Sequence, residues 1–243
     1  MKTLTLSKRC AKEILRDPIN LFFGLGFPIV LLLLLSAMQK NIPVDLFSIE
    51  SLAPGIAVFG LSFITLFSAT IISKDRESAL LLRLYTAPIR PWEFILGYAL
   101  PVLPIALLQS AVSYIVGLML GLSLSLNIVY AILAIIPIAI LYIALGLLFG
   151  SILTSKQAGG VCGALLTNLS AWLSGIWFDI ELIGEGFAKF ARLLPFVHAV
   201  ELERAVIAGD VSASLSHLLP ILAYSIGASV CAVLLFLRQM KRQ

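Results

Sequence analysis

The chain has 243 residues, of which 60% are hydrophobic and only 12% are charged, and its formal net charge is +4. Soluble domains are about half apolar and about a quarter charged, so this composition excludes a soluble enzyme and indicates an all-α integral membrane protein. The three cysteines are Cys10, Cys162 and Cys231. Their odd number and apolar surroundings favour small apolar fillers over a disulfide framework or a metal site.

Residues 4–17 predict a basic amphipathic helix. At about 100° per residue, apolar side chains share one side of this helix and basic side chains share the other. The apolar side carries Leu4, Leu6, Cys10, Ala11, Ile14 and Leu15, and the basic side carries Lys8, Arg9, Lys12 and Arg16. Such a helix lies in the membrane interface with its basic face toward anionic lipid. It serves either as a topology anchor or as a lever that also touches a cytosolic partner.

Six segments are long and apolar enough to cross the hydrocarbon, which takes about 20 residues of helix. They are residues 19–38, 51–73, 94–120, 128–155, 157–178 and 218–237. The third and fourth spans come from one uncharged stretch that divides at residues 121–127. The first span begins too late to be a cleaved signal peptide, so we expect it to be retained.

The basic residues predict the orientation of these spans. Thirteen of the 17 Lys and Arg residues precede the first span, lie in the second-to-third and fourth-to-fifth loops, or follow the last span. The positive-inside rule then places both termini in the cytoplasm, with the chain in the plasma membrane. The basic charge is therefore explained by topology and the lipid surface, and we expect no nucleic-acid partner.

The loop between the second and third spans predicts a cytosolic helix. Ser73 can cap its N-terminus, with Asp75 and Glu77 in the first turn, and Pro88 and Pro91 end it. Leucines run around most of its circumference, at positions Leu80, Leu81, Leu82 and Leu84. A cytosolic helix this apolar must bury itself against protein or membrane.

The long loop before the last span predicts an outer re-entrant hairpin. An apolar stripe over residues 183–194 is broken by Pro195, and a short helix follows to Gly209. Glu203 falls on the apolar face of that second helix, where an ionisable group marks function by default. The alternatives are a carboxylate that reaches water or pairs with Arg192, and a carboxylate that helps to gate the outer exit.

Catalytic patterns are absent from the sequence. It contains no phosphate-binding Gly-x-x-x-x-Gly-Lys-Ser/Thr loop, so we expect no nucleotide hydrolysis by this chain. The predicted spans hold few charges, which disfavours a proton- or sodium-coupled carrier. Glycine pairs at four-residue spacing permit close helix approach, within the chain or at a homodimer seam. These pairs are Gly117 and Gly121, Gly146 and Gly150, and Gly159 and Gly163.

Taken together, the segments resemble the membrane subunits of ATP-binding-cassette exporters of the second permease class. The likeness covers nearly the whole chain, as a single transmembrane permease domain over residues 1–243. The local matches are Asp75-Arg76-Glu77, Arg83-Leu84, Thr86-Ala87-Pro88-Ile89, and Leu193-Leu194-Pro195-Phe196 through Arg204. The chain departs from the family pattern at Ser78-Ala79, where Gly-Thr is frequent, and at Tyr98, where Lys is frequent.

The resemblance implies a half-transporter that binds no cofactor, pairs with a second copy or a related permease, and docks on a separate ATPase that carries ATP and Mg. It places coupling to the ATPase at Asp75, Arg76, Glu77, Leu80, Leu81, Arg83 and Leu84. Spans one, two and five would line the path, so it makes Phe59, Phe63, Phe67, Asn168 and Trp172 candidates for cargo contact. The outer gate is expected at Pro195, Phe196, Glu203 and Arg204.

The function expected from this resemblance is ATP-driven export of an amphipathic or lipid-like cargo, such as a drug, lipid, glycan or peptide. The main alternative is a stand-alone secondary transporter or channel that works without an ATPase. A structural membrane protein and an intramembrane enzyme are further alternatives.

Overall fold

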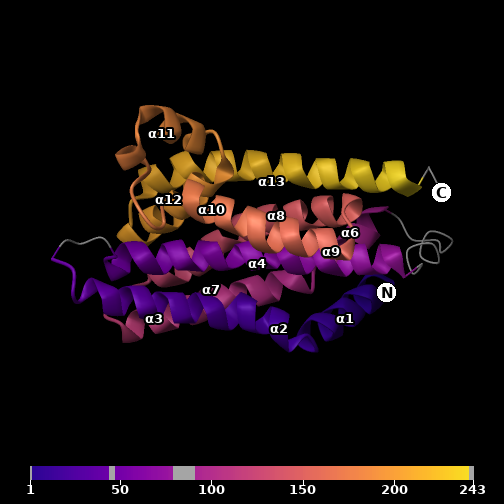
Figure 1. The fold of residues 1–243 in the computed structure, drawn as a ribbon, viewed down its shortest axis with the longest axis horizontal. Coiled ribbons are helices and arrows are strands. Elements are labelled where there is room, and N and C mark those ends of the chain that lie inside the picture. Colours follow the sequence, from indigo (N-terminus) through magenta and orange to yellow (C-terminus); the bar gives the residue numbers. More distant parts are fainter. Residues whose placement is uncertain (1, 44–46, 79–90, 241–243) are drawn as a thin grey trace.

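The computed structural model describes residues 2–43, 47–78 and 91–240. Within these ranges the chain is helical, contains no β-strand, and forms an elongated bundle whose long helices run roughly along one axis (Figure 1). The segment that holds Leu80, Leu81, Arg83 and Leu84 lies outside the described residues, so the predicted coupling helix is described only at its start, from Asp75 to Glu77.

Five stretches of the described chain are helical, long and apolar enough to cross a membrane. They are Pro18–Gln39, Ile49–Glu77, Ile95–Met119, Asn127–Ile152 and Val211–Arg238. The helices that form them are α2 (Pro18–Leu21), the π-helix η1 (Phe22–Gly26), α3 (Phe27–Gln39), α4 (Ile49–Glu77), α6 (Pro91–Ala99), α7 (Val102–Met119), α8 (Asn127–Ile152) and α13 (Val211–Met240). These stretches confirm five of the six predicted spans.

The predicted span 157–178 is not among the five. Its place is taken by α9 (Ser155–Ala158), the π-helix η2 (Gly159–Leu166) and α10 (Thr167–Leu173), which follow one another without a gap. Polar residues such as Lys156, Gln157 and Asn168 lower the hydropathy of this stretch. Its predicted end is wrong: the helix stops at Leu173, and Gly175 adopts a left-handed backbone angle (φ +74°).

Helix α4 is the centre of the bundle, and 89% of its most apolar window is buried. It contacts α3, α7, α8 and α12. The closest approach is to α8, where a Cβ atom on Gly146 would lie 2.5 Å from the Thr65 carbonyl oxygen. Thr65 also donates a hydrogen bond from Oγ1 to the Tyr142 carbonyl at 2.8 Å. The predicted pair of Gly146 and Gly150 therefore serves helix packing within the chain, which is one of its two predicted roles.

The helix ends gather at two ends of the bundle (Figure 1). One end holds α1 (Lys2–Leu15), the last turn of α4, the start of α6, α9 and the end of α13. The other end holds the 3-10 helix η3 (Ile180–Ile183), α11 (Glu185–Arg192), the end of α3 and the start of α4. The first of these is the end at which the sequence predicts the cytoplasm, and we call it the inner end.

The predicted hairpin before the last span consists of α11 and α12 (Pro195–Ala208). Pro195 begins α12 in the first helical turn, where its missing N–H costs nothing. Gly209 ends α12 with a left-handed backbone angle (φ +77°), which glycine adopts without strain. Helix α12 packs against α4, α8 and α13. The prediction of two short helices that meet at Pro195 is confirmed.

Candidate functional site

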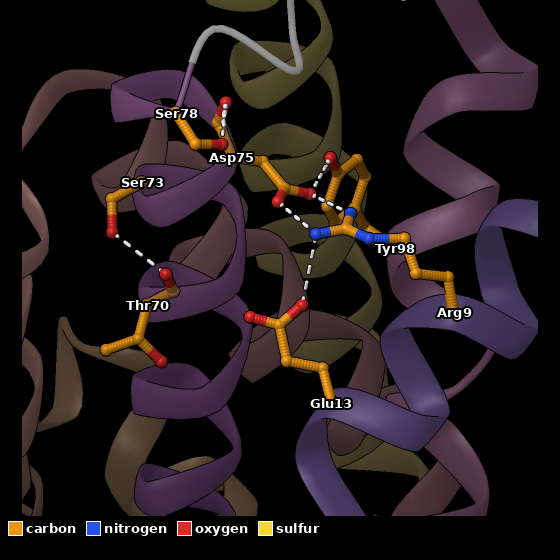
Figure 2. Close-up of polar contacts among 7 residues, drawn as sticks. All are labelled: Arg9, Glu13, Thr70, Ser73, Asp75, Ser78 and Tyr98. Atoms are coloured by element: carbon orange, nitrogen blue, oxygen red, sulfur yellow. Dashed lines mark hydrogen bonds and ion pairs between the residues drawn. The ribbon is translucent and has the colours of Figure 1, made fainter.

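The predicted coupling residues Asp75, Arg76 and Glu77 form the last turn of α4 rather than the first turn of a separate helix. The prediction that Ser73 caps a new helix is wrong, because α4 runs through Ser73 without a break. The Ser73 hydroxyl instead donates to the Thr70 carbonyl one turn back, at 3.1 Å (Figure 2). The continuous helix places these three residues at the inner end of the central helix.

Asp75 is buried in a cluster that joins three helices, and only 1% of it is exposed. The Arg9 guanidinium of α1 binds both carboxylate oxygens, with 2.6 Å from Nη1 to Oδ2 and 2.6 Å from Nη2 to Oδ1 (Figure 2). The Tyr98 hydroxyl of α6 donates to Oδ2 at 2.6 Å. Glu13 holds Arg9 from the same helix, at 3.2 Å. We call Arg9, Glu13, Asp75 and Tyr98 the inner cluster.

Electrostatics at the inner cluster follow from this geometry. The hydrogen bonds from Arg9 to the Asp75 carboxylate raise the pKa of Arg9 above its usual value, so the guanidinium stays charged. Burial raises the pKa of the neighbouring Cys10 thiol to about 12. A thiol with that pKa is protonated and unreactive at neutral pH. The inner cluster is therefore a fixed ion pair with a protonated thiol beside it.

The predicted apolar side of α1 is only partly buried against the bundle, because Leu4 is 57% exposed and Leu15 is 63% exposed. Leu6, Cys10 and Ile14 are each less than 10% exposed, whereas the basic residues Lys8 and Lys12 are exposed. Leu6 packs over α6 at Gly97, where a Cβ atom would lie 2.7 Å from the Leu6 Cδ2 atom. Since glycine alone leaves this space, α1 and α6 approach closely beside the inner cluster.

The other two residues of the α4 terminus hold the turn between α8 and α9. Arg76 donates from its guanidinium to the carbonyl oxygens of Ser151 and Leu153, the latter at 2.5 Å. A cation at these last carbonyls satisfies acceptors that the end of α8 leaves free. The Glu77 carboxylate accepts from the backbone N–H of Ser155 at 2.8 Å and from its hydroxyl at 2.6 Å.

The predicted cargo-path residues are only partly brought together. Phe59, Phe63 and Phe67 are all at most 5% exposed. Phe59 and Phe63 have ring centroids 5.8 Å apart and belong to an aromatic group. Other members of that group are Phe23, Phe27 and Trp177. These phenylalanines therefore pack within this chain.

The other two path residues lie away from this aromatic group. Asn168 and Trp172 are exposed on α10, and 57% of Trp172 is exposed. Trp172 packs on Phe178, with ring centroids 5.9 Å apart. The Asn168 amide donates to the Ala164 carbonyl of the preceding π-helix η2 at 2.8 Å.

The predicted gate residues lie on α12, but they face different neighbours. Phe196 is buried and its ring centroid is 6.3 Å from that of Tyr142 on α8. Arg204 donates to the Gly175 carbonyl at 3.0 Å and to the Ser51 carbonyl at 3.3 Å. These bonds tie α12 to the start of α4 and to the turn that follows α10.

Glu203 is 0% exposed and accepts a hydrogen bond from the Tyr114 hydroxyl of α7. The suggested pair with Arg192 is wrong, because Arg192 forms its ion pair with Glu181 in the described chain. The suggestion that the Glu203 carboxyl reaches water is also wrong, because this side chain is fully buried.

A cavity of about 700 Å³ lies between α12, η3 and the start of α13. We call it the outer cavity, because the sequence predicts the outside of the membrane at this end of the bundle. Its lining includes Glu201 and Arg204 of α12, and two histidines that contact each other. The Nδ1 atoms of His198 and His217 are 3.0 Å apart, and His198 Nε2 lies 3.0 Å from the Arg192 carbonyl oxygen. A carbonyl only accepts, so Nε2 of His198 carries a proton, and when His198 is neutral His217 Nδ1 donates to it.

Sequence reasoning missed the partners of the two buried carboxyl groups. The amphipathic pattern places Arg9 on a lipid-facing basic stripe, although it binds a carboxylate 66 positions away. The family pattern marks Tyr98 only as a departure, and no pattern in the sequence analysis marks Tyr114. The position of both tyrosines within apolar spans could have indicated these contacts, because a buried hydroxyl group normally has a hydrogen-bond partner.

Two curated relatives, from Escherichia coli strain K12 and from Escherichia coli O157:H7, are both described as "Probable multidrug ABC transporter permease YbhR". Each is 22% identical to this chain over 207 residues, which cover 83% of this chain and 55% of the relative. The chain thus spans about half the length of the curated relatives it matches.

A family model described as "ABC-2 type transporter" matches residues 1–208, from the N-terminus to the end of α12. The match includes the inner cluster, the last turn of α4 and the buried Glu203. It confirms the resemblance stated from the sequence, and this chain belongs to the ABC-2 type transporter family, as a membrane permease domain.

Proposed function

We propose that this chain is the membrane subunit of an ATP-driven exporter and that ATP is hydrolysed on a separate partner subunit. One observation carries the proposal beyond family membership. The last turn of α4 lies just before residues 79–90. Within it, Asp75 binds α1 and α6 through the inner cluster. Arg76 and Glu77 bind the turn between α8 and α9. A displacement of residues 79–90 by an ATPase would therefore act on several helices at once.

The proposed arrangement keeps six crossings, with α9, η2 and α10 as the fifth. Both termini lie in the cytoplasm, α1 rests in the membrane interface, and α11 and α12 dip into the outer leaflet. Two observations support this. The inner end holds both α1 and the end of α13 (Figure 1). Lys8 and Lys12 on α1, and Arg16 directly after it, are exposed, as contact with anionic lipid requires.

The proposed cargo is amphipathic or lipid-like: a drug, lipid, glycan or peptide. The printed description of the relatives as probable multidrug permeases supports a drug. The exposed Trp172 and Asn168 on α10 offer an aromatic and an amide group for such a cargo. Phe59, Phe63 and Phe67 would contact cargo only if neighbouring helices move away from α4, because all three are at most 5% exposed.

A stand-alone secondary transporter or channel remains the second candidate, and one observation favours it. Glu203 is a fully buried carboxyl within a mostly apolar bundle. Buried carboxyl groups of this kind carry protons or ions in transporters that use no ATPase. Transport by the purified chain in liposomes without ATP would support this candidate.

Co-purification tests the leading proposal. The chain is tagged in its native membrane and extracted gently, and the proteins that accompany it are identified. We expect a stoichiometric ATP-binding-cassette ATPase and a second permease copy, its own or a related one. We also expect the ATPase to be lost when Leu80, Leu81 and Leu84 are changed to Ser. Recovery of the chain without an ATPase, even after cross-linking, would overturn the proposal.

A charge reversal tests the coupling role of the α4 terminus. Glu77→Lys removes the acceptor that holds Ser155 and places a cation beside Arg76, so we expect ATPase stimulation by this subunit to fall several-fold while membrane insertion stays intact. Arg83→Glu should have the same effect. Glu185→Lys at the other end of the bundle is the control, because Glu185 is highly exposed and pairs with Lys189 of its own helix at 3.6 Å. Unchanged stimulation in both coupling variants would remove these residues from the coupling role.

A further inference from the structure

The carboxyl group of Glu203 is isolated from other charges. Tyr114 contributes its one hydrogen bond, to Oε2, and Oε1 has no partner among the described residues. Both side chains are 0% exposed. The neighbouring cation Arg204 points away from it, to the carbonyl oxygens of Ser51 and Gly175.

The other titratable groups near α12 are engaged elsewhere. From α11, Arg192 pairs with Glu181 of η3, and from α13, His217 contacts His198. On α8, the buried Tyr142 packs on Phe196. Within the described ranges, none of these groups forms an ion pair or hydrogen bond with the Glu203 carboxyl.

An ionised carboxylate in such a place is expensive. Transferring a charge from water to an apolar interior without a counter-charge costs many kcal/mol, and such groups take up a proton instead. One hydrogen bond from a neutral phenol does not offset that cost. Burial accordingly raises the pKa of the Glu203 carboxyl.

We propose that Glu203 is a proton-binding site that controls the docking of α12 in the bundle, where Tyr114 of α7 reaches it. With α12 packed as in this structure, the carboxyl is protonated and accepts the Tyr114 hydroxyl bond. When α12 moves away from Tyr114, the carboxyl meets water, releases the proton to it and becomes a hydrated carboxylate. Return of α12 requires one proton from water, so atoms and charge balance in each cycle.

The position of α12 indicates the side from which the proton comes. One face of α12 carries Glu203 against Tyr114, and another lines the outer cavity of about 700 Å³ with Val197, His198 and Glu201. A displacement of α12 would bring Glu203 toward this cavity, so the proton exchanges with the outer aqueous phase. This step adds a proton-dependent outer gate to the proposed function, but protonation and docking are measurable without transport.

Infrared spectroscopy of the purified chain in lipid nanodiscs tests the proton. We expect a protonated-carboxyl carbonyl band at pH 7 that disappears between about pH 7 and pH 9.5 and is absent in Glu203→Gln. Glu201→Gln is the matched control, since Glu201 lies two positions away and pairs with Arg204 at the cavity, and it should keep the band. Absence of the band at every pH, or its persistence in Glu203→Gln, would overturn the proposal.

Thermal unfolding tests the docking. An acid whose pKa is raised in the folded state contributes less stability as the pH rises from its unfolded pKa, about 4.3, through its folded pKa. The wild-type melting temperature should therefore fall between about pH 5 and pH 8, whereas Glu203→Gln, which resembles the neutral acid, should lose that pH dependence. The same pH dependence in both proteins would overturn the link between the proton and docking. Because neither readout involves an ATPase or cargo, failure here leaves the proposed function standing.

Discussion

Asp75 shows how this chain keeps a charged residue inside an apolar bundle. Its carboxylate is 1% exposed and receives three hydrogen bonds, from both Arg9 amino groups and from the Tyr98 hydroxyl. Breaking a buried pair by removing one partner leaves an uncompensated charge, which costs about 3–5 kcal/mol. The Arg9 side chain is 41% exposed, so water screens the pair and the cost is reduced.

Removing the Arg9 guanidinium should therefore destabilise the protein measurably. We expect Arg9→Ala to lower the free energy of unfolding in detergent by about 2 kcal/mol, the lower side of the cost of breaking a buried pair. Arg16→Ala is the matched control, because Arg16 is an exposed cation of the same basic stripe, one residue beyond α1. Equal losses in the two variants would show that the Arg9–Asp75 pair adds nothing to the stability.

The same pair can be isolated from the general effects of each substitution. In an Asp75→Asn background the buried charge is gone, so Arg9→Ala should cost less than in the wild type. The difference between the two losses is the coupling energy of the pair, and we expect about 1–2 kcal/mol. Additive losses would mean that the two residues act independently, in spite of the 2.6 Å contacts.

At the scale of elements, α1 is attached to the bundle mainly through α6 and the end of α4. Gly97 leaves space for Leu6, and a larger residue would push α1 off α6 because its Cβ atom would lie 2.7 Å from Leu6. We expect Gly97→Val to expose Cys10, which is 0% exposed in the wild type and whose pKa is raised to about 12 by burial. Maleimide labelling of Cys10 should then rise at least ten-fold at pH 7.

The labelling experiment needs a background in which Cys231 is replaced by Ser, because Cys231 is exposed. Gly227→Val is the control, since a Cβ atom at Gly227 meets nothing within 4 Å. Labelling of Cys10 that is as low in Gly97→Val as in Gly227→Val would show that α1 does not depend on this contact.

The elements also show what the sequence could and could not predict. Hydropathy predicted six spans and five of them are confirmed, because a helix that crosses lipid needs an apolar surface whichever neighbours it packs against. The capping pattern misplaced the start of the coupling segment, because the Ser73 hydroxyl bonds to its own helix instead of capping a new one. The amphipathic pattern of α1 predicted its buried face, but not that Arg9 turns inward to Asp75. Such a contact depends on tertiary packing, which no local pattern records.

At the scale of the whole molecule, the number of crossings decides on which side each loop lies. Helix α8 runs toward the inner end, and α13 also ends there (Figure 1). After α8, the stretch from Ser155 to Leu173 leads to α11 and α12 at the opposite end, and α13 follows them. If this stretch crosses the membrane, Lys156 and Glu185 face opposite aqueous phases, and if it does not, they share one.

Cysteine labelling in intact cells distinguishes these two arrangements. Lys156 and Glu185 are both exposed, so Lys156→Cys and Glu185→Cys each present a reactive thiol in a background without the native cysteines. We expect a membrane-impermeant maleimide to label position 185 in intact cells and position 156 only after the membrane is opened, because the basic residues place the α8–α9 turn in the cytoplasm. Labelling of both positions in intact cells, or of neither, would mean that the weakly apolar stretch with Lys156, Gln157 and Asn168 stays on one side.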